Sequence, residues 1–180
     1  MATTAAGSAL AISAVLPSRA DLLGYATLTY LDIGGLEKIG TYGGTPATVS
    51  YQPLRGARQK RKGPTDFGGL QPKLAPDYAD AGQALLAVAA AEKRRQFAFR
   101  IMLSDGGIRY FQGRVFDFLE AVENAESILH VTGRVEINTP IVKATAAQPL
   151  PDGYAFVTTN DGVEGVTTSD GFELVTTRVN

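Results

Sequence analysis

The sequence contains no cysteine and only one histidine, His130. Without cysteine there are no disulfide bonds, no thiolate metal sites and no cysteine nucleophile. A single imidazole cannot build a metal site that needs two or three histidines. These absences argue against most hydrolytic and redox enzymes and leave only carboxylate chemistry open.

Long hydrophobic runs are also missing. The longest apolar run, residues 84–91, has eight residues, whereas a membrane-spanning helix needs about 20. No basic residue precedes the apolar stretch at the N-terminus, so the charged region of a secretory signal is lacking. We therefore expect no membrane anchor.

Net charge is close to zero, but the charges are unevenly distributed. The chain has 17 basic and 18 acidic residues. Residues 1–100 contain 12 basic and 7 acidic residues, a net charge of +5. Residues 101–180 contain 5 basic and 11 acidic residues, a net charge of −6. Oppositely charged halves suit self-association between different regions of identical copies. The alternative is that both sets of charges lie on solvated surface and simply cancel.

At 180 residues, the chain fits one domain with arms or a small appendage. Residues 1–20 form a small-residue N-terminal arm, which either frays or docks. The β-branched and aromatic residues of 22–33 predict a strand that Gly34-Gly35 closes. Alternation of apolar and polar residues over 47–52 predicts a second strand.

Residues 53–80 show no sustained periodicity of apolar and polar residues and contain four prolines and four glycines. This composition predicts a long irregular loop. Its first third carries five basic residues and no acidic one: Arg55, Arg58, Lys60, Arg61 and Lys62. Such a run could contact nucleic acid phosphates. Because no aromatic residues interleave with it and the chain is not basic overall, a solvated or protein-contacting loop is favoured.

A helix is predicted over residues 81–95. Asp80 followed by Gln83 has the form of an N-terminal capping box. The following residues are strong helix formers, and the basic residues 93–95 stand where a helix C-terminus favours positive charge.

Strands are predicted on both sides of a turn at residues 104–107, over 96–103 and 108–120. The alternation slips near Gly113, which suggests a bulge or bend there. After an acidic loop at 121–127, residues 129–137 alternate again. We therefore predict that residues 21–145 form a mainly β fold, an antiparallel β-sandwich or partial barrel with one flanking α-helix.

Val-Thr-Thr recurs three times in residues 146–180, at positions 157–159, 166–168 and 175–177. The two Asp-Gly dipeptides between these units favour turns, so this region predicts a small C-terminal β-meander. Calcium-binding repeats of similar length need a richer glycine–aspartate pattern than this.

Sites for chemistry are scarce. His130 lies on the polar side of a predicted strand without a recognisable nucleophile, and no phosphate-binding glycine loop occurs. Acidic residues near 117–126 could supply a carboxylate pair but more simply form a solvated rim. We therefore predict no enzymatic activity and no cofactor.

Residues 96–138 resemble the tail tube proteins (major tail proteins) of bacteriophages with long, non-contractile tails. The shared pattern is a helix, a strand ending in the Ser-Asp-Gly hairpin of residues 104–106, and then Phe-x-Gly-x-Val at 111–115. An acidic loop and a strand with Thr-Gly-x-Val at 132–135 follow. The resemblance extends over residues 20–140 and includes the long loop before the helix, but not the meander.

The resemblance implies a structural virion protein of the phage tail, assembled in the host cytoplasm. Members of the family form hexameric rings whose sheets join into a continuous barrel. The rings stack into a tube that houses the tape-measure protein and conducts DNA, which passes without specific binding. Related folds occur in contractile tails and secretion machines, and a tail-end adaptor or terminator subunit is an alternative. An alternative of another class is a carbohydrate-binding or adhesive β-sandwich, against which the absence of tryptophan argues.

Two sets of contact residues are predicted on this basis. The five basic residues at 55–62 are expected to contact the next ring, where acidic residues form the counter-surface: Asp117, Glu120, Glu123 and Glu126. The polar sides of the predicted strands supply candidates for the channel lining: Arg100, Arg134 and Glu136.

Overall fold

A computed structural model describes residues 4–122, 128–145, 154–158 and 164–168, which form thirteen strands and two helices. In chain order these elements are β1 (Ala9–Ser13), α1 (Leu22–Ala26), β2 (Leu31–Asp32), β3 (Leu36–Lys38), β4 (Thr45–Tyr51), β5 (Gln59–Asp66), β6 (Gly69–Leu70), β7 (Lys73–Leu74), α2 (Ala81–Ala91), β8 (Phe97–Met102), β9 (Gly107–Ala121), β10 (His130–Ile137), β11 (Val142–Thr145), β12 (Tyr154–Thr158) and β13 (Glu164–Thr168).

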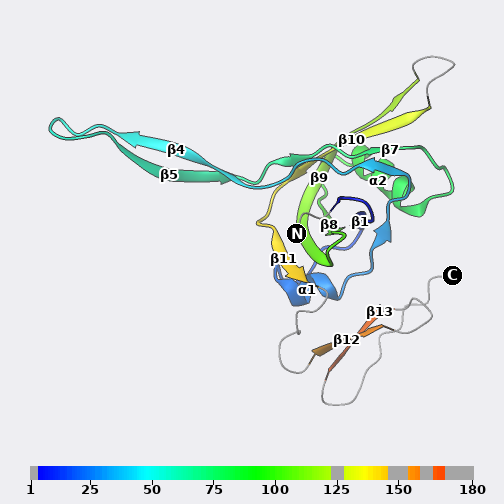
Figure 1. Cartoon of the computed structure of the whole chain (residues 1–180). Coiled ribbons are helices and arrows are strands. Elements are labelled where there is room, and N and C mark those ends of the chain that lie inside the picture. The colour runs from blue at the N-terminus through cyan, green and yellow to red at the C-terminus, as the bar shows by residue number, and fades with distance from the viewer. Residues whose placement is uncertain (1–3, 123–127, 146–153, 159–163, 169–180) are drawn as a thin grey trace.

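Nine strands form one antiparallel sheet in the order β2-β1-β8-β9-β10-β7-β3, with β11 also paired to β9 and β6 to β10. The sheet curls around the core without closing, and β9 follows the curve (Figure 1). The first half of β9 pairs with β8 and β11, and its second half pairs with β10. The prediction of a mainly β, antiparallel fold with a flanking helix is confirmed.

The core fills the inside of the curl. Phe97 and Phe99 of β8, Phe111 of β9 and Leu86 of α2 are essentially inaccessible to solvent. The rings of Phe99 and Phe111 stack with centroids 5.4 Å apart. Each such side chain contributes roughly 1.5–3 kcal/mol by leaving water, so this layer stabilises the curl.

The start of α2 was predicted correctly. The Asp80 carboxylate accepts hydrogen bonds from the backbone N–H groups of Gln83, at 2.7 Å, and of Gly34, at 3.1 Å. The Gln83 side chain does not complete a capping box but reaches the neighbouring loops. The predicted end at residue 95 was wrong, because the chain becomes extended at Glu92.

The single strand predicted over residues 22–33 was also wrong. Residues Leu22–Ala26 form the short helix α1, and only Leu31–Asp32 is a strand. Asp21 caps the helix by accepting a hydrogen bond from the Gly24 N–H at 2.9 Å. A capping aspartate before an apolar segment therefore overrode the β propensity of the residues that follow.

The segment predicted as one long irregular loop, residues 53–80, contains three strands. Its residues Gln59–Asp66 form β5, which pairs with β4, while β6 and β7 pair with β10. Charged sequence concealed β5, which pairs through the backbone and buries little, whereas β6 and β7 are only two residues long although Leu70 and Leu74 are fully buried. Within the N-terminal arm, residues Ala9–Ser13 dock as β1 between β8 and β2.

The slip in alternation near Gly113 has a different cause from the one predicted. Tyr110 and Phe111 point to opposite sides of β9, and both sides are covered, so both residues are buried. The register between β9 and β10 instead shifts between Arg134 and Val135 of β10. These two residues pair with Asp117 and Val115 of β9, so Phe116 has no partner residue on β10.

A second apolar cluster lies on the other side of the sheet, beneath α1. Tyr25 and Tyr30 surround Tyr110 of β9, with ring centroids 5.4 and 6.0 Å from it. Arg100 lies 5.0 Å from the Tyr30 ring centre and 3.3 Å from the Asp32 carboxylate. Burial, and secondarily the neighbouring Tyr110, raise the pKa of Tyr30 well above its usual range.

In the C-terminal region, β12 and β13 form a separate antiparallel pair with Phe156 opposite Val166. This agrees with the first two strands of the predicted meander. The third Val-Thr-Thr unit, at 175–177, lies outside the described residues.

Replacing Gln83 with leucine is expected to lower the free energy of unfolding by about 3 kcal/mol, because three buried or half-buried backbone groups lose their partners. The Gln83 amide accepts from the Asp77 N–H at 2.9 Å and donates to the carbonyls of Gly34 and Ala75 at 3.0 Å each. Urea unfolding checks this, with exposed Gln71→Leu as the control. Equal stability of the two variants would contradict this account of the network.

Alkaline pH is expected to destabilise the fold through Tyr30. Because the pKa of Tyr30 is raised in the folded state, folding favours the neutral phenol. This contribution to the free energy of unfolding is fully present below the unfolded pKa of about 10 and is lost as the pH rises above it. One such proton changes stability by at most about 1.4 kcal/mol per pH unit. Denaturant unfolding between neutral and strongly alkaline pH should show a shallower decline for Tyr30→Phe than for the wild type. The matched control Tyr78→Phe, at an exposed position, should leave the slope unchanged.

Candidate assembly surfaces

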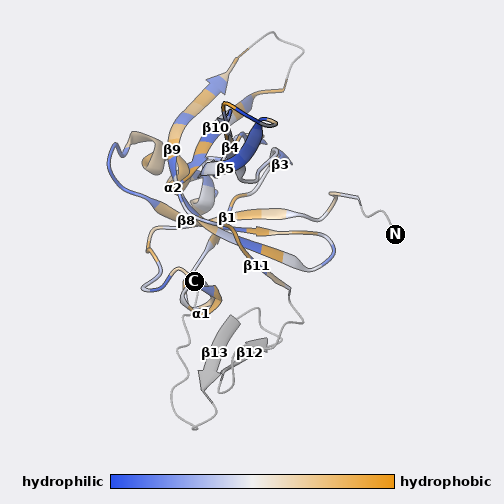
Figure 2. Cartoon of the chain, turned by 90° about the vertical axis from the view of Figure 1, so that its left-hand side faces the viewer, coloured by the Kyte–Doolittle hydropathy of each residue, from blue (hydrophilic) through white to orange (hydrophobic). Residues whose placement is uncertain are grey.

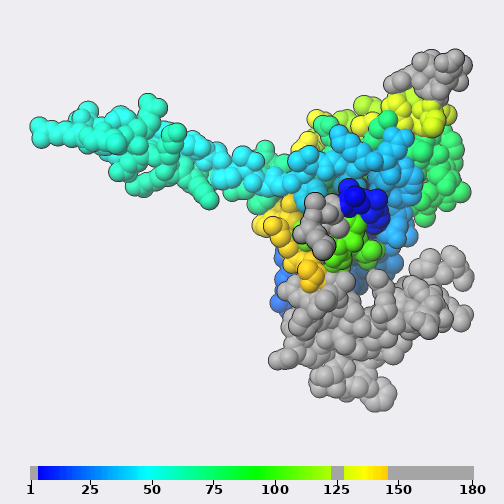
Figure 3. All heavy atoms as spheres, in the orientation of Figure 1, coloured from blue at the N-terminus to red at the C-terminus, as the bar shows by residue number. Residues whose placement is uncertain are grey.

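The β4–β5 pair forms a two-stranded ribbon that projects from the body of the molecule (Figures 1 and 3). It is a separate two-stranded sheet, and nearly all of its residues are exposed. An isolated two-stranded hairpin is only marginally stable in water, so a ribbon of this kind gains from a further partner. This makes it the first candidate surface.

The ribbon has a bulge near its base. Pro46 lies opposite Thr65, but Thr48 lies opposite Lys62, so residues 63–64 of β5 oppose a single residue of β4. Proline cannot donate to the ladder and is tolerated at such a bulge. A Cβ atom at Gly63 would stand 2.9 Å from a methyl carbon of Val49, so glycine is needed for this close approach.

The five basic residues of the predicted contact set all lie on this ribbon and are all exposed. Arg55 and Arg58 belong to the connection between the strands, and the other three belong to β5. Along β5, Lys60 and Lys62 share one side and Arg61 points to the other, because successive side chains of a strand alternate. Figure 2 shows the strongly hydrophilic character of β5.

The predicted acidic counter-surface is only partly brought together. Asp117 and Glu120 lie on opposite sides of β9, since Asp117 pairs in register with Arg134 and Glu120 with the buried Val131. Asp117 also forms an ion pair of 2.8 Å with Arg134 of the same chain. The remaining two residues, Glu123 and Glu126, lie outside the described residues.

Among the channel candidates, Arg134 and Glu136 lie on one side of β10, where residues alternate with the buried ones of the core. Arg100 belongs to the Tyr30 cluster, and its side chain is only 15% exposed. The structure therefore separates Arg100 from the other two. A channel-lining role for these residues stays a prediction.

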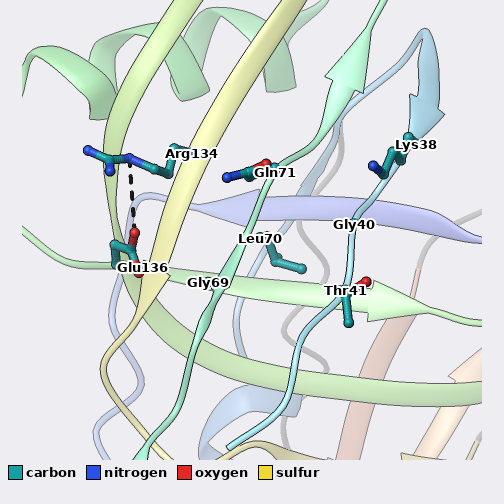
Figure 4. A pocket seen from close by; sticks show the side chains of 8 residues that line it. All are labelled: Lys38, Gly40, Thr41, Gly69, Leu70, Gln71, Arg134 and Glu136. Atoms are coloured by element: carbon teal, nitrogen blue, oxygen red, sulfur yellow. Dashed lines mark ion pairs between the residues drawn. The ribbon is translucent and has the colours of Figure 1, made fainter.

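A shallow depression of about 320 Å³ lies on this open side of the sheet (Figure 4). Arg134 and Glu136 flank it from β10, with Arg134 Nε 3.9 Å from Glu136 Oε1. Lys38 reaches it from β3, across the segment that contains Gln71. The depression is lined mainly by polar residues, and Arg134 is paired there with Glu136 and with Asp117.

Within the described residues, no group of three or more acidic, histidine or cysteine side chains could hold a metal ion. His130 is half-buried and has interaction partners in the chain.

None of the helices in the described part of the chain is long and apolar enough to cross a membrane.

Sequence reasoning missed the exposed apolar residues at the end of the β9–β10 hairpin. Phe116 and Leu119 on β9 are 52% and 62% exposed, and Val122, which follows β9, is 79% exposed. Leu129, immediately before β10, is 47% exposed. The sequence signal was weak, because residues 116, 119 and 122 are spaced by three and do not follow the alternation of a strand.

Comparison with solved structures finds chains of similar fold. A chain in the cryo-EM structure of an extracellular contractile injection system, the PVC sheath/tube terminator in its extended state, matches with a TM-score of 0.60 and 6% identity over 81% of this chain and 98% of that one. A chain in the cryo-EM structure of the anti-feeding prophage (AFP) baseplate, 6-fold symmetrised, matches with a TM-score of 0.60 and 12% identity. The match covers 82% of this chain and 100% of that one. No protein-family model and no curated protein matches the sequence. At these identities the likeness shows a shared fold.

Proposed function

We propose that this chain is a non-enzymatic structural subunit of a phage tail or of a phage-tail-like injection system, in which identical copies assemble into rings. The observation that carries the proposal is the exposed β4–β5 ribbon, which has no partner strand within the described residues beyond its own pair. The fold likeness supports it, because the two similar chains come from tail-like assemblies and are matched over nearly their whole length.

A second feature supports ring formation. β8 pairs with β9 only as far as Gly113, and β10 occupies the opposite edge beyond that point. Among the described residues, no strand therefore pairs with one edge of β9 from Arg114 to Ala121. An unpaired strand edge favours pairing with another chain, and closing a ring of sheets removes such edges.

Within this class we propose the tube itself: stacked, hexameric rings that surround the tape-measure protein and conduct DNA in the virion tail. Ribbons that reach from one copy to a different surface of the next form a heterologous contact, which generates open stacks. The alternative is a terminator or baseplate adaptor, which caps a tube with a single ring. The similar chain from a sheath/tube terminator structure favours that alternative.

The deciding experiment is electron microscopy of the purified full chain at high protein concentration, combined with sedimentation velocity. Stacked tubes of uniform width are expected for a tube subunit. Rings that never stack would support the terminator alternative instead. A monomer at every concentration would contradict both.

The positive charge of the ribbon is expected to promote assembly at low ionic strength. Replacing Arg55, Arg58, Lys60, Arg61 and Lys62 with alanine changes the net charge from −1 to −6 and removes the attraction to acidic surfaces of a neighbouring copy. Light scattering should show that the variant assembles more slowly at low salt, with the difference shrinking at about 1 M salt, where the screening length is about 3 Å. The control Lys93→Ala/Arg94→Ala removes exposed charge beyond α2. A salt-independent difference would contradict the electrostatic role.

A further inference from the structure

The two sides of the ribbon differ in chemistry. One side carries Val49 and Tyr51, which are 52% and 59% exposed, with Arg61 opposite Val49. The other side carries Lys60 opposite Ser50, and then Lys62 opposite Thr48. We call the first the apolar side and the second the lysine side.

The apolar side is unusual for a fully solvated hairpin. Exposed strands normally keep polar residues on both sides, whereas a half-apolar strand normally covers a core. Leu54, in the connection at the end of the ribbon, is also fully exposed. Apolar side chains gathered on an isolated projection indicate a surface that another molecule covers.

A second exposed apolar surface lies at the end of the β9–β10 hairpin. We define it by Val122 and Leu129, which are 79% and 47% exposed and lie on the same side of the hairpin, because Ala121 pairs with His130. From Val115 to Leu129 the sequence has no lysine or arginine, and Glu120 lies on the same side of the hairpin as Val122 and Leu129. The hairpin end is therefore apolar and acidic, and the ribbon is apolar and basic.

One molecule cannot bring these two surfaces together. In Figures 1 and 3 the ribbon extends to one side, and the end of the β9–β10 hairpin points away from it. The complementary partner of each surface is therefore a second copy of the same chain. The contact joins different surfaces of the two copies, so each bound copy leaves one ribbon and one hairpin end available for further copies.

We infer that the apolar side of the ribbon, with Val49 and Tyr51, packs on the end of the β9–β10 hairpin of a second copy, around Val122 and Leu129. This rests on the proposed function and deepens it by naming the two surfaces that meet. The lysine side faces away from that contact, so Lys60 and Lys62 act only through long-range attraction. Arg61, on the apolar side, lies near the acidic residues of the hairpin end.

The test compares two double variants of β4 that add the same charge to opposite sides. Val49→Lys/Tyr51→Lys alters the apolar side, and Thr48→Lys/Ser50→Lys alters the lysine side. Because all four positions lie on the exposed ribbon, outside the core, both variants should keep the far-UV circular dichroism of the wild type. The first is expected to raise the protein concentration needed for assembly by at least about tenfold, as expected for the loss of buried anchor residues. The second should change it less than about twofold, as for positions outside the contact.

Cysteine cross-linking gives an independent readout, since the natural chain contains no cysteine. Tyr51→Cys protein is mixed with a larger, tagged Val122→Cys protein during assembly and oxidised with copper phenanthroline. A disulfide requires Cβ atoms about 3.5–4.5 Å apart, so a mixed dimer on a non-reducing gel reports the contact. Ser50→Cys, which lies on the lysine side, is the matched control and should give much less of the mixed dimer.

The outcomes separate this inference from the proposed function. If the wild type assembles but the two lysine variants are equally affected, or Ser50→Cys cross-links as well as Tyr51→Cys, the inference is overturned and the proposed function stands. If the wild type fails to assemble at all, both are overturned.

Discussion

Backbone pairing along β9 is the constraint on which the rest of the structure depends. This one strand joins β8 and β11 near its start and β10 near its end, so its curvature determines where both parts of the sheet lie. The phenylalanines of β8 and β9 and Leu86 of α2 fill the space inside the curl. Because β8 leaves β9 at Gly113, the second half of β9 keeps one unpaired edge among the described residues. The same feature that organises the core therefore also leaves the sheet incomplete.

An incomplete sheet and an exposed ribbon are unfavourable in an isolated protein. Unpaired strand edges invite aggregation, and exposed apolar side chains lose the free energy that burial would give. A subunit that always meets identical copies can tolerate both, since each unsatisfied surface is covered in the assembly. In the body of the protein, the core side chains are buried and the α2 cap network is hydrogen-bonded internally. Among the described residues, the ribbon, the hairpin end and the open edge of β9 are therefore the surfaces on which the proposed assembly depends.

The sequence predicted best those elements whose side chains alternate clearly. The strands 96–103 and 129–137, the turn at 104–107 and the cap at Asp80 correspond closely to β8, β10, the β8–β9 turn and the start of α2. The prediction failed where backbone pairing, not hydrophobic alternation, specifies the structure: β5 is rich in charge and buries nothing. It failed again at α1, where one capping aspartate decided between helix and strand. The positions of the basic residues were evident, but their division between two sides of a ribbon required the β4–β5 register.

That division changes how the opposite charges of the two halves of the chain contribute to assembly. Charge acts over about 8 Å at physiological ionic strength and needs no contact, so it accelerates the encounter of a basic ribbon with an acidic hairpin end. It does not hold the two in place, because exposed ion pairs contribute little to stability. Apolar side chains act only at contact, and their burial determines how long two copies stay together. In the proposed contact, Lys60 and Lys62 on one side of the narrow ribbon would promote the encounter of two copies, and Val49 and Tyr51 on the other side would stabilise their contact.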